Sequence, residues 1–427
     1  MKKKILFIPY TFSAGGGSEK CLATLVNSLD LEKYEISIIE IEYFGLKKES
    51  LDPKIKLLPP IMLHFSNQFR RSVLLNILEI RPHIIRSYFN LDNYDVVIAW
   101  THVLSPLLLS AFLDSNTVVW LHGVIGDWNI SAKEKKVISL ADEVVMISKH
   151  AFNSFEELFP NYTGGKSLIY NAFDAESCIE FAKEYINFDF IRNTFPVLIA
   201  VGRLDQNKNF SLIIRAVFEL KSCGIKCNLL LIGIGEQMKE LQLLSELLDV
   251  KDSVFFLGYK QNPMPYINHA DILCLSSLSE GFPTVVCEAM ALGKPFVTTP
   301  VSGSSDELSA GGLCGLVSTW DSKDYAEKIA RLLRDKSLYN RMSHNCVEKI
   351  KEFSVDISVS SFDSLIQNMS PLKKRKTRTM PKIIAMIKLL LYSAPMIFVL
   401  LNNMLKKIVK AILPYGIVWL FQKKYRR

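Results

Sequence analysis

Apolar residues along the chain fall into short runs separated by longer polar or helical stretches. In the first half, the runs that predict β-strands are 4–9, 36–39, 96–100, 118–122, 144–148 and 166–170. Between the first two runs, apolar residues within 22–29 recur at helical spacing. Strands that alternate with helices predict a parallel sheet covered on both faces.

A second alternation of the same kind follows. Its predicted strands are 197–201, 228–232, 254–257, 272–275 and 296–299. The stretch 172–195 is charged and has weak strand character, so we place an interdomain hinge there, and 324–333 forms an amphipathic helix. The pattern predicts an α/β fold with two doubly wound, Rossmann-like sheets, whose ligand sites lie at the carboxyl ends of the strands.

Length and cysteine usage agree with this organisation. A chain of 427 residues, 49% of them apolar, suits two domains with sizeable cores. The eight cysteines are scattered without a CxxC or a metal-ligand spacing, which is typical of reduced thiols in a cytosolic protein. The first apolar run ends at Pro9 and a glycine-rich loop follows, so it predicts a strand and not a signal peptide.

The positive charge is concentrated in one segment. The chain carries a net charge of +8, but residues 371–427 hold fourteen Lys and Arg and no acid, which leaves −6 for residues 1–370. The body is therefore a poor candidate for nucleic-acid binding, and we expect no nucleic-acid partner.

The most informative stretch begins at Glu280. Glu280 and Glu288 are eight residues apart, and the sequence around them predicts a loop, then a helix that stops at Gly293, then a strand. We expect Glu280 in the loop and Glu288 near the first helical turn, where unpaired N–H groups suit a phosphorylated ligand. The carboxylates are better placed to accept hydrogen bonds from sugar or ribose hydroxyls.

Two cations follow the first strand of the second half. Gly202 permits a sharp turn, and Arg203 and Lys208 lie in the same strand-end loop. That placement suits a diphosphate, which the cations would hold and stabilise as it leaves. The alternative is an exposed loop with ordinary solvated charges.

Other signals are weaker by themselves. The GxGE segment, with Gly233, Gly235 and Glu236, could be a plain strand-to-helix turn. Single polar residues also stand at predicted strand ends: His122 could hydrogen-bond a sugar hydroxyl or could be a satisfied histidine, and Asn171 is unremarkable alone.

The glycine turn near the N-terminus has the same status. Gly16 and Gly17 precede Ser18 and Glu19 at a predicted helix start, and the turn could approach a phosphate or sugar closely. It could equally be a tight turn with Ser18 as the helix N-cap.

The paired carboxylates also invite a glycosidase interpretation. We discount it because glycosidases do not need the Arg203 and Lys208 pair or a cleft between two sheets. DxD, HExxH and GxxxxGK[ST] segments are absent from the sequence, so it gives no positive reason to invoke a metal or an ATP-type phosphate loop.

Taken together, these segments resemble the retaining glycosyltransferases of the GT-B type, in the family-four group (glycosyl transferases group 1) that uses nucleotide sugars. The resemblance covers about residues 1–366. The motifs that carry it, in order, are Gly-Gly-Ser-Glu at 16–19, His122 with Gly123, Gly202-Arg203 with Lys208, GxGE at 233–236 and EGFPTVVCEAMALGKP from 280.

The resemblance implies a role for each matching residue. Glu288 would hold the ribose hydroxyls of the donor, and Glu280 would contact the donor sugar. Arg203 and Lys208 would bind the diphosphate, and His122 would lie near the transferred sugar. The catalytic set is then Glu280, Arg203, Lys208 and His122. The further donor-binding residues are Gly281, Phe282, Pro283, Thr284, Val285, Gly202, Gly233, Gly235 and Glu236.

The acceptor side is less well defined. By resemblance, Gly16, Gly17, Ser18 and Glu19 would lie between donor and acceptor, together with Asn171. The segment Asn171-Ala172-Phe173-Asp174 departs from the Asn-Gly-Val-Asp of many relatives, so the local acceptor contacts stay open.

The resemblance also implies how the chain is divided and how it reacts. We expect an acceptor-side domain at 1–185, a nucleotide-sugar domain at 186–352, a helix crossing back at 353–370 and a tail at 371–427. The donor would be a UDP- or GDP-linked sugar, with no further cofactor and no metal. The acceptor hydroxyl would attack from the side that the diphosphate leaves, and the departing phosphate would act as the base.

The tail predicts association with a membrane. It is basic and strongly apolar, but its longest uncharged run, Leu389–Leu405, has 17 residues, against the ~20 needed to span a bilayer. We therefore expect interfacial helices on the anionic inner face of the plasma membrane, with a single span or a helix packed on protein as alternatives. A membrane-bound cytoplasmic enzyme suggests a polyprenyl-diphosphate-linked acceptor and a role in bacterial surface polysaccharides such as capsule or lipopolysaccharide.

Two other functions stay open on the sequence alone. The chain could be a nucleotide-sugar epimerase or phosphorylase of the same architecture, and a phosphorylase would need a lysine that holds a pyridoxal cofactor. It could also be a non-catalytic scaffold or carbohydrate-binding subunit of a glycan-assembly complex, although the intact charged residues argue against decay.

Overall fold

A computed structural model describes residues 2–46, 49–64, 77–78, 81–101, 104–112, 114–128, 130–188, 191 and 194–369. The predicted tail, 371–427, lies outside the described residues. Within the described ranges, no helix is both long enough and apolar enough to cross a membrane.

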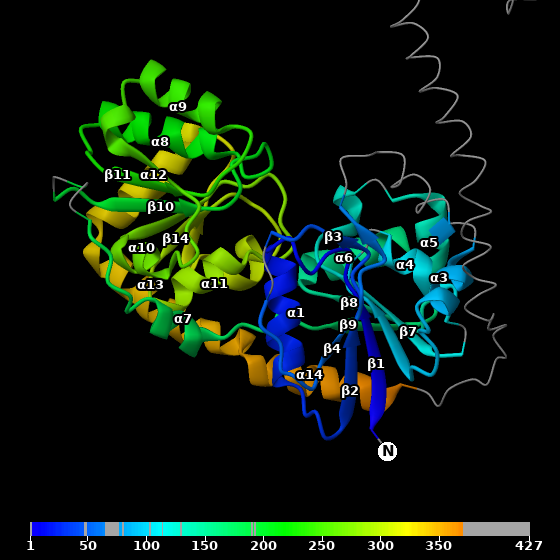
Figure 1. Cartoon of the computed structure of the whole chain (residues 1–427). Coiled ribbons are helices and arrows are strands. Elements are labelled where there is room, and N and C mark those ends of the chain that lie inside the picture. The colour runs from blue at the N-terminus through cyan, green and yellow to red at the C-terminus, as the bar shows by residue number, and fades with distance from the viewer. Residues whose placement is uncertain are drawn as a thin grey trace, which may run out of the picture.

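The N-terminal body is built on a parallel sheet of seven strands (Figure 1). Its spatial order is β4-β2-β1-β6-β7-β8-β9. The strands are β1 (Lys3–Ile8), β2 (Tyr34–Ile38), β4 (Lys56–Leu57), β6 (Val96–Ala99), β7 (Asn116–Leu121), β8 (Glu143–Met146) and β9 (Gly165–Leu168), and a small separate pair is formed by β3 (Glu42–Tyr43) and β5 (Met62–Leu63). The helices of this body are α1 (Gly17–Ser28), α3 (Pro82–Tyr88), α4 (Ser105–Leu109), the short 3₁₀ helix η1 (Ile125–Asp127), α5 (Ala132–Ile138) and α6 (Lys149–Leu158).

The C-terminal body has a parallel sheet of six strands in the order β12-β11-β10-β13-β14-β15. These strands are β10 (Val197–Val201), β11 (Asn228–Ile232), β12 (Val254–Gly258), β13 (Ile272–Leu275), β14 (Phe296–Thr298) and β15 (Gly315–Val317). The helical segments around them are α7 (Ala175–Phe181), α8 (Phe210–Ser222), α9 (Met238–Leu247), η2 (Lys251–Ser253), α10 (Met264–His269), α11 (Thr284–Ala291), η3 (Ser304–Leu308), η4 (Ala310–Gly312), α12 (Ser322–Arg334), α13 (Lys336–Lys349) and η5 (Ile350–Phe353).

The predicted fold is confirmed. Buried runs of Val, Ile and Leu became parallel strands, because helices cover both faces of each sheet and leave no face for polar residues. The sequence missed the short strands β3, β4, β5 and β15, which have too few residues for a recognisable pattern.

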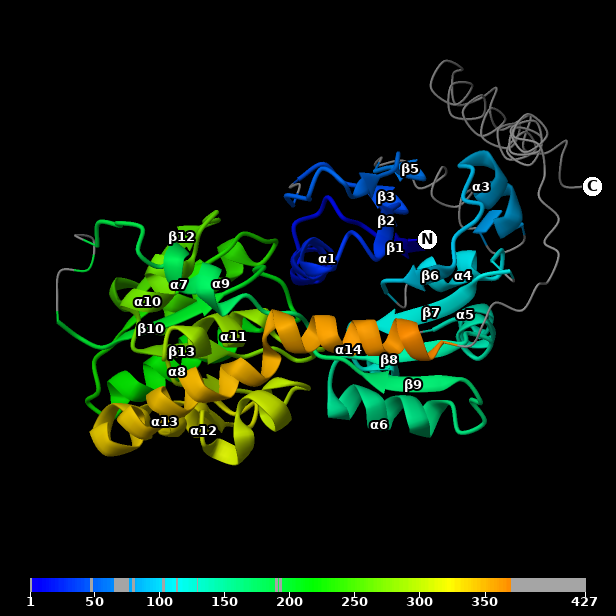
Figure 2. The ribbon, with the colours of Figure 1, turned by 90° about the horizontal axis from the view of Figure 1, so that it is seen from below.

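The last described helix, α14 (Val355–Asn368), runs from the C-terminal body across to the N-terminal sheet (Figure 2). There the Lys3 ammonium donates to Ile366 O at 2.7 Å, and the Tyr34 hydroxyl donates to Asp363 Oδ1 at 2.9 Å. The chain passes between the two bodies twice, once near Phe173 and once near Phe353. These two segments lie side by side, because Phe173 N–H donates to Phe353 O at 3.2 Å. The predicted domain boundaries at 185 and 352 stay a prediction.

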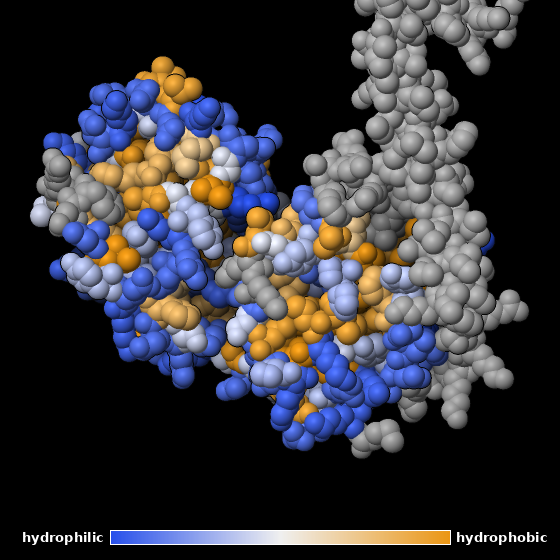
Figure 3. Space-filling view, viewed as in Figure 1, coloured by the Kyte–Doolittle hydropathy of each residue, from blue (hydrophilic) through white to orange (hydrophobic). Residues whose placement is uncertain are grey.

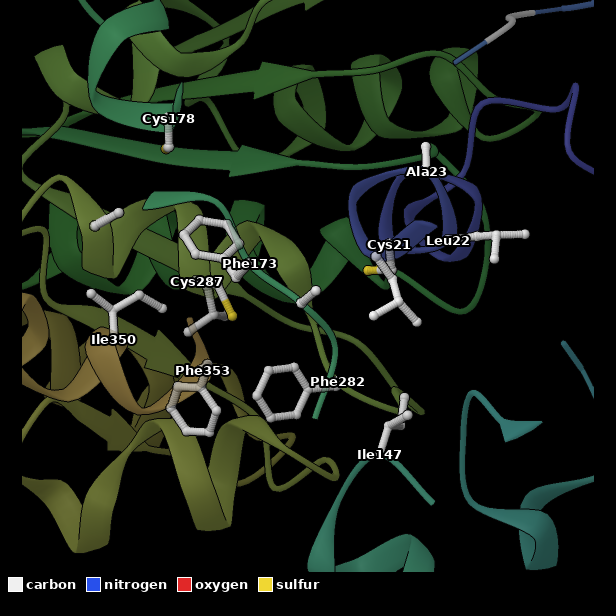
Figure 4. Packing of buried hydrophobic residues seen from close by; sticks show 14 of the residues in the cluster. Cys21, Leu22, Ala23, Ile147, Phe173, Cys178, Phe282, Cys287, Ile350 and Phe353 are labelled. Atoms are coloured by element: carbon white, nitrogen blue, oxygen red, sulfur yellow. The ribbon is translucent and has the colours of Figure 1, made fainter. Parts of the chain in front are cut away.

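A hydrophobic core is shared between the two bodies. One cluster of buried residues includes Ile147 after β8, Cys21 on α1, and Phe282 and Cys287 around α11. Figure 4 shows these side chains together with Phe353 of the same cluster. On the face in Figure 3, a notch separates the two bodies.

Candidate donor site in the cleft

The carboxyl ends of three neighbouring strands bring the predicted donor residues together. β11, β10 and β13 are adjacent in the parallel sheet, so the loops that follow them meet at one edge. These loops contain the Gly233–Glu236 turn, the Gly202–Lys208 loop and the segment leading to Glu280. The parallel topology therefore assembles three motifs that are far apart in the sequence.

The two glycine turns interlock through their backbones. Gly202 N–H donates to Ile232 O at 2.9 Å, and Leu204 N–H donates to Ile234 O at 3.0 Å. A Cβ on Gly233, whose φ is +144°, would lie 1.8 Å from Gly202 O, and one on Gly235 would lie 2.3 Å from Leu204 O. Glycine is thus required at both positions by the packing of one turn on the other, and Glu236 is exposed beside them.

Lys208 and Glu280 form an ion pair at this edge. Their side chains are 20% and 13% exposed, so both charges are largely withdrawn from water. The Ser277 hydroxyl also donates to Glu280 Oε1, at 2.6 Å. Arg203 behaves differently: its side chain is 82% exposed and lies 3.3 Å from Asp205. A diphosphate at this edge would meet one solvated cation and one already paired with a carboxylate.

Hydrogen bonds that the sequence did not indicate fix the loop before Glu280. The Asn207 amide donates to Ser279 O at 3.0 Å and accepts from Ser279 N–H at 3.1 Å. Ser277 O accepts from the Thr299 hydroxyl at 2.6 Å and from the Trp320 indole at 3.2 Å. No motif marks these residues, because their role depends on contacts between separate loops.

The loop after Glu280 contacts the opposite body. A Cβ on Gly281 would lie 2.3 Å from His122 O and 2.8 Å from the Gly123 Cα. A Cβ on Gly17 would lie 3.4 Å from the Thr284 hydroxyl oxygen. The N-terminal glycine turn and the His122-Gly123 segment therefore meet the Gly281–Val285 segment, which includes the buried Phe282 and Pro283. Donor-side and acceptor-side motifs line one cleft.

Glu288 lies at the same interface. α11 begins at Thr284, so Glu288 is in its second turn and not at the first turn expected from the sequence. The residue is 7% exposed. Lys20 of α1, a residue that the sequence analysis did not single out, places its ammonium nitrogen 2.9 Å from Glu288 Oε1.

The N-terminal glycine turn is followed by a buried acidic residue, Glu19, that hydrogen-bonds to the turn. Glu19 is buried, and burial raises the pKa of its carboxyl, although hydrogen bonds from the turn oppose that shift. One of those bonds comes from the Ser18 hydroxyl, at 3.1 Å. The hypothesis that Ser18 is the N-cap is wrong, because α1 begins at Gly17 and Gly16 occupies the N-cap. Glu19 thus stabilises the conformation of the turn through these hydrogen bonds.

His122 directly follows a strand, as predicted, whereas Asn171 lies three residues beyond the end of β9 at Leu168. β7 ends at Leu121, and the His122 ring lies 4.5 Å from the Trp100 ring, centroid to centroid. Asn171 is 7% exposed, and its Oδ1 has no hydrogen-bond partner among the residues that the structure describes.

The large hollow elsewhere in the molecule is separate from these residues. A cavity of about 1070 Å³ lies beside β7, β8, β9 and α14, and none of the predicted site residues lines it. Among the described residues, no cluster of three or more His, Cys, Asp or Glu could hold a metal ion.

The chain is similar to known glycosyltransferases. Residues 182–349 match the family model of glycosyl transferases group 1. A Campylobacter jejuni enzyme, N-acetylgalactosamine-N,N'-diacetylbacillosaminyl-diphospho-undecaprenol 4-alpha-N-acetylgalactosaminyltransferase, is 25% identical over 372 residues, 83% of this chain and 96% of that one. The Staphylococcus aureus capsular polysaccharide biosynthesis glycosyltransferase CapM is 25% identical over 241 residues, 54% of this chain and 63% of its own.

A solved structure has the same fold. The crystal structure of Anabaena HepE in complex with UDP-glucose aligns with a TM-score of 0.63 and 20% identity, over 85% of this chain and 99% of that one. The fold is that of the GT-B type, and the sequence similarities are to glycosyltransferases. Within that class, the chain resembles the group 1 enzymes, because its C-terminal body matches the model of that family.

Proposed function

We propose that this protein is a retaining glycosyltransferase that moves a sugar from a UDP- or GDP-linked donor to a lipid-linked glycan during bacterial surface polysaccharide synthesis. The observation that carries the proposal is the assembly at one sheet edge of Lys208, Glu280 and the interlocked glycine turns, with Glu288 on α11 of the same body. Two similar proteins support it: the HepE structure holds UDP-glucose, and the name of the Campylobacter enzyme contains a diphospho-undecaprenol acceptor.

In the proposed reaction, the bond between the sugar C1 and the diphosphate oxygen breaks as the acceptor hydroxyl oxygen bonds to C1 on the same face. The acceptor proton goes to the departing phosphate. Arg203 and Lys208 stabilise the negative charge that grows on that phosphate, which is the task we assign to them in place of a metal ion. Glu280 and Glu288 accept hydrogen bonds from donor hydroxyls and hold C1 in position.

The location is also part of the proposal. We place the protein in the cytoplasm, held on the anionic inner face of the plasma membrane by the basic tail, 371–427. Retention of a tail-deleted protein in the membrane fraction, in low and high salt alike, would contradict that role of the tail.

A thermal-shift panel of UDP- and GDP-sugars tests the function. A donor present at 100 times its Kd stabilises the folded state by about 2.7 kcal/mol. The Lys208→Ala variant is expected to lose most of this stabilisation while remaining folded. Lys221→Ala is the matched control, because Lys221 lies in the same body and pairs with the exposed Asp249 away from the site.

Two outcomes bear on separate parts of the proposal. If no nucleotide sugar raised the melting temperature of the wild-type protein, the transferase assignment would lose its basis. With an active donor, NMR of the product must show the donor's own anomeric configuration, and an inverted anomer would disprove the retaining mechanism.

A further inference from the structure

One cation reaches the donor site from the opposite body. Lys20 is on α1, and its Nζ lies 2.9 Å from Oε1 of Glu288, a residue 268 positions further along the chain. The Glu288 side chain is only 9% exposed, whereas that of Lys20 is 51% exposed. The contact thus joins a cation at the rim of the cleft to a carboxylate inside it.

The position of Lys20 in its helix does not explain its presence. Lys20 is in the first turn of α1, where the helix dipole places partial positive charge and disfavours a cation. Burial would lower the pKa of Lys20, but attraction to Glu288 and the hydrogen bond between them outweigh burial, and the pKa is raised. The interaction with Glu288 therefore dominates the environment of Lys20.

The surroundings make this ion pair stronger than one in open water. Cys21 and Cys287, the neighbours of Lys20 and Glu288 in sequence, belong to the buried cluster shared by the two bodies (Figure 4). The Cys178 thiol of α7 lies 3.7 Å from Glu288 O. Low-polarity groups at this contact reduce the screening of the two charges.

We propose that Lys20 is a positioning residue of the donor site, which orients the Glu288 carboxylate for the ribose diol and makes ribose binding depend on closure of the two bodies. This inference rests on the proposed function. Lys20 occupies Oε1, and Oε2 has lone pairs of its own for a ribose hydroxyl. Because the ammonium comes from the opposite body, separating the bodies would remove it and free the Glu288 carboxylate to turn.

The closeness of the two bodies at this point supports the coupling. A Cβ on Gly17, three residues before Lys20, would be in ordinary van der Waals contact with Thr284, 3.4 Å from its hydroxyl oxygen. Gly281 leaves no room for a Cβ against His122 O. Lys20 therefore reaches Glu288 where the two bodies are in direct contact.

The test is calorimetric titration of the full-length protein with UDP, GDP and their 2′-deoxy analogues. Lys20→Met keeps most of the length of the side chain and removes the charge. We expect it to raise the Kd of the better ribonucleotide about tenfold, equal to ~1.4 kcal/mol. The Kd of the matching 2′-deoxy nucleotide should change less than about twofold, because that ligand lacks one of the hydroxyls that an oriented Glu288 would bind.

Two further variants complete the experiment. Lys20→Arg should restore most of the ribonucleotide affinity, because a guanidinium can also pair with the carboxylate. Lys33→Met is the matched control: Lys33 is also in the N-terminal body, and its nitrogen lies 3.7 Å from carboxylates of Asp30 and Asp363, away from the cleft. It should leave both affinities unchanged. If Lys20→Met does not fold, Lys20→Gln replaces it.

Each remaining result overturns a different statement. Unchanged affinity for both nucleotides in Lys20→Met, with normal binding by the wild-type protein, overturns the role of Lys20 and leaves the proposed function intact. Equal losses for the ribo- and deoxyribonucleotides show a general structural effect and overturn the orientation of Glu288. No binding of UDP or GDP by the wild-type protein overturns the proposed function, and this inference with it.

Discussion

Replacing Gly281 with alanine separates the two bodies at a defined point. The new Cβ would lie 2.3 Å from His122 O, whereas ordinary van der Waals contact begins near 3.4 Å. The obstacle is backbone, which cannot rotate away, so the segments must part by about 1 Å. A misplacement of ~1 Å between reacting groups can reduce the rate by about 10²-fold. We therefore expect kcat for sugar transfer to fall about 100-fold in Gly281→Ala.

The assay is release of UDP or GDP from the donor identified by the thermal-shift panel, measured with a lipid-linked acceptor. The matched control is Gly224→Ala. Gly224 has a φ of +75° and open space around a Cβ, so alanine there strains the backbone without touching the cleft. It should cost about 1–2 kcal/mol of stability and leave kcat per folded molecule unchanged. A Gly281→Ala enzyme with kcat within twofold of the wild type would refute the view that transfer needs this contact between the two bodies.

Two further predictions concern the stability of the scaffold. Arg86→Met should lower the free energy of unfolding, measured in urea titrations, by about 2–4 kcal/mol. The reason is that the Arg86 side chain is 4% exposed and pairs with Asp92 at 3.0 Å and with Asp114 at 2.6 Å. A loss below ~1 kcal/mol would contradict this. Asp324 has a pKa lowered to about 2, chiefly by the hydrogen bond from Thr319 N–H, so its stabilising contribution is complete above pH ~4 and is lost as the pH falls towards 2. Because the Asp324 side chain is 28% exposed, Asp324→Asn should cost only about 1–2 kcal/mol at pH 7 and almost nothing at pH 2, and a penalty independent of pH would refute the assignment.

Much of the fold follows from the order of polar and apolar residues. The predicted strands 197–201, 228–232 and 272–275 coincide with β10, β11 and β13. These strands are buried on both faces, so their sequences are continuous apolar runs that a local pattern detects. The same method missed β15, which has only three residues, and placed the start of α11 too late.

The sequence also indicated the motifs of the donor site, but it did not indicate which of their charged side chains pair with one another. The sequence placed Arg203 and Lys208 together as two cations for a diphosphate. The structure separates them: Lys208 pairs with Glu280, and Arg203 extends into solvent. Which of two neighbouring cations finds a carboxylate depends on the direction of each side chain at the sheet edge, and sequence spacing does not contain that direction.

The sequence by itself determined the secondary structure, the doubly wound class of the fold and the types of residue at the strand ends. These follow from burial and from backbone geometry, which act over a few residues at a time. Only the tertiary structure decided that Glu288 meets Lys20 and that Gly281 meets His122 O. Both contacts join the two bodies across the cleft. They depend on how two sheets pack at long range, and no local pattern encodes that packing.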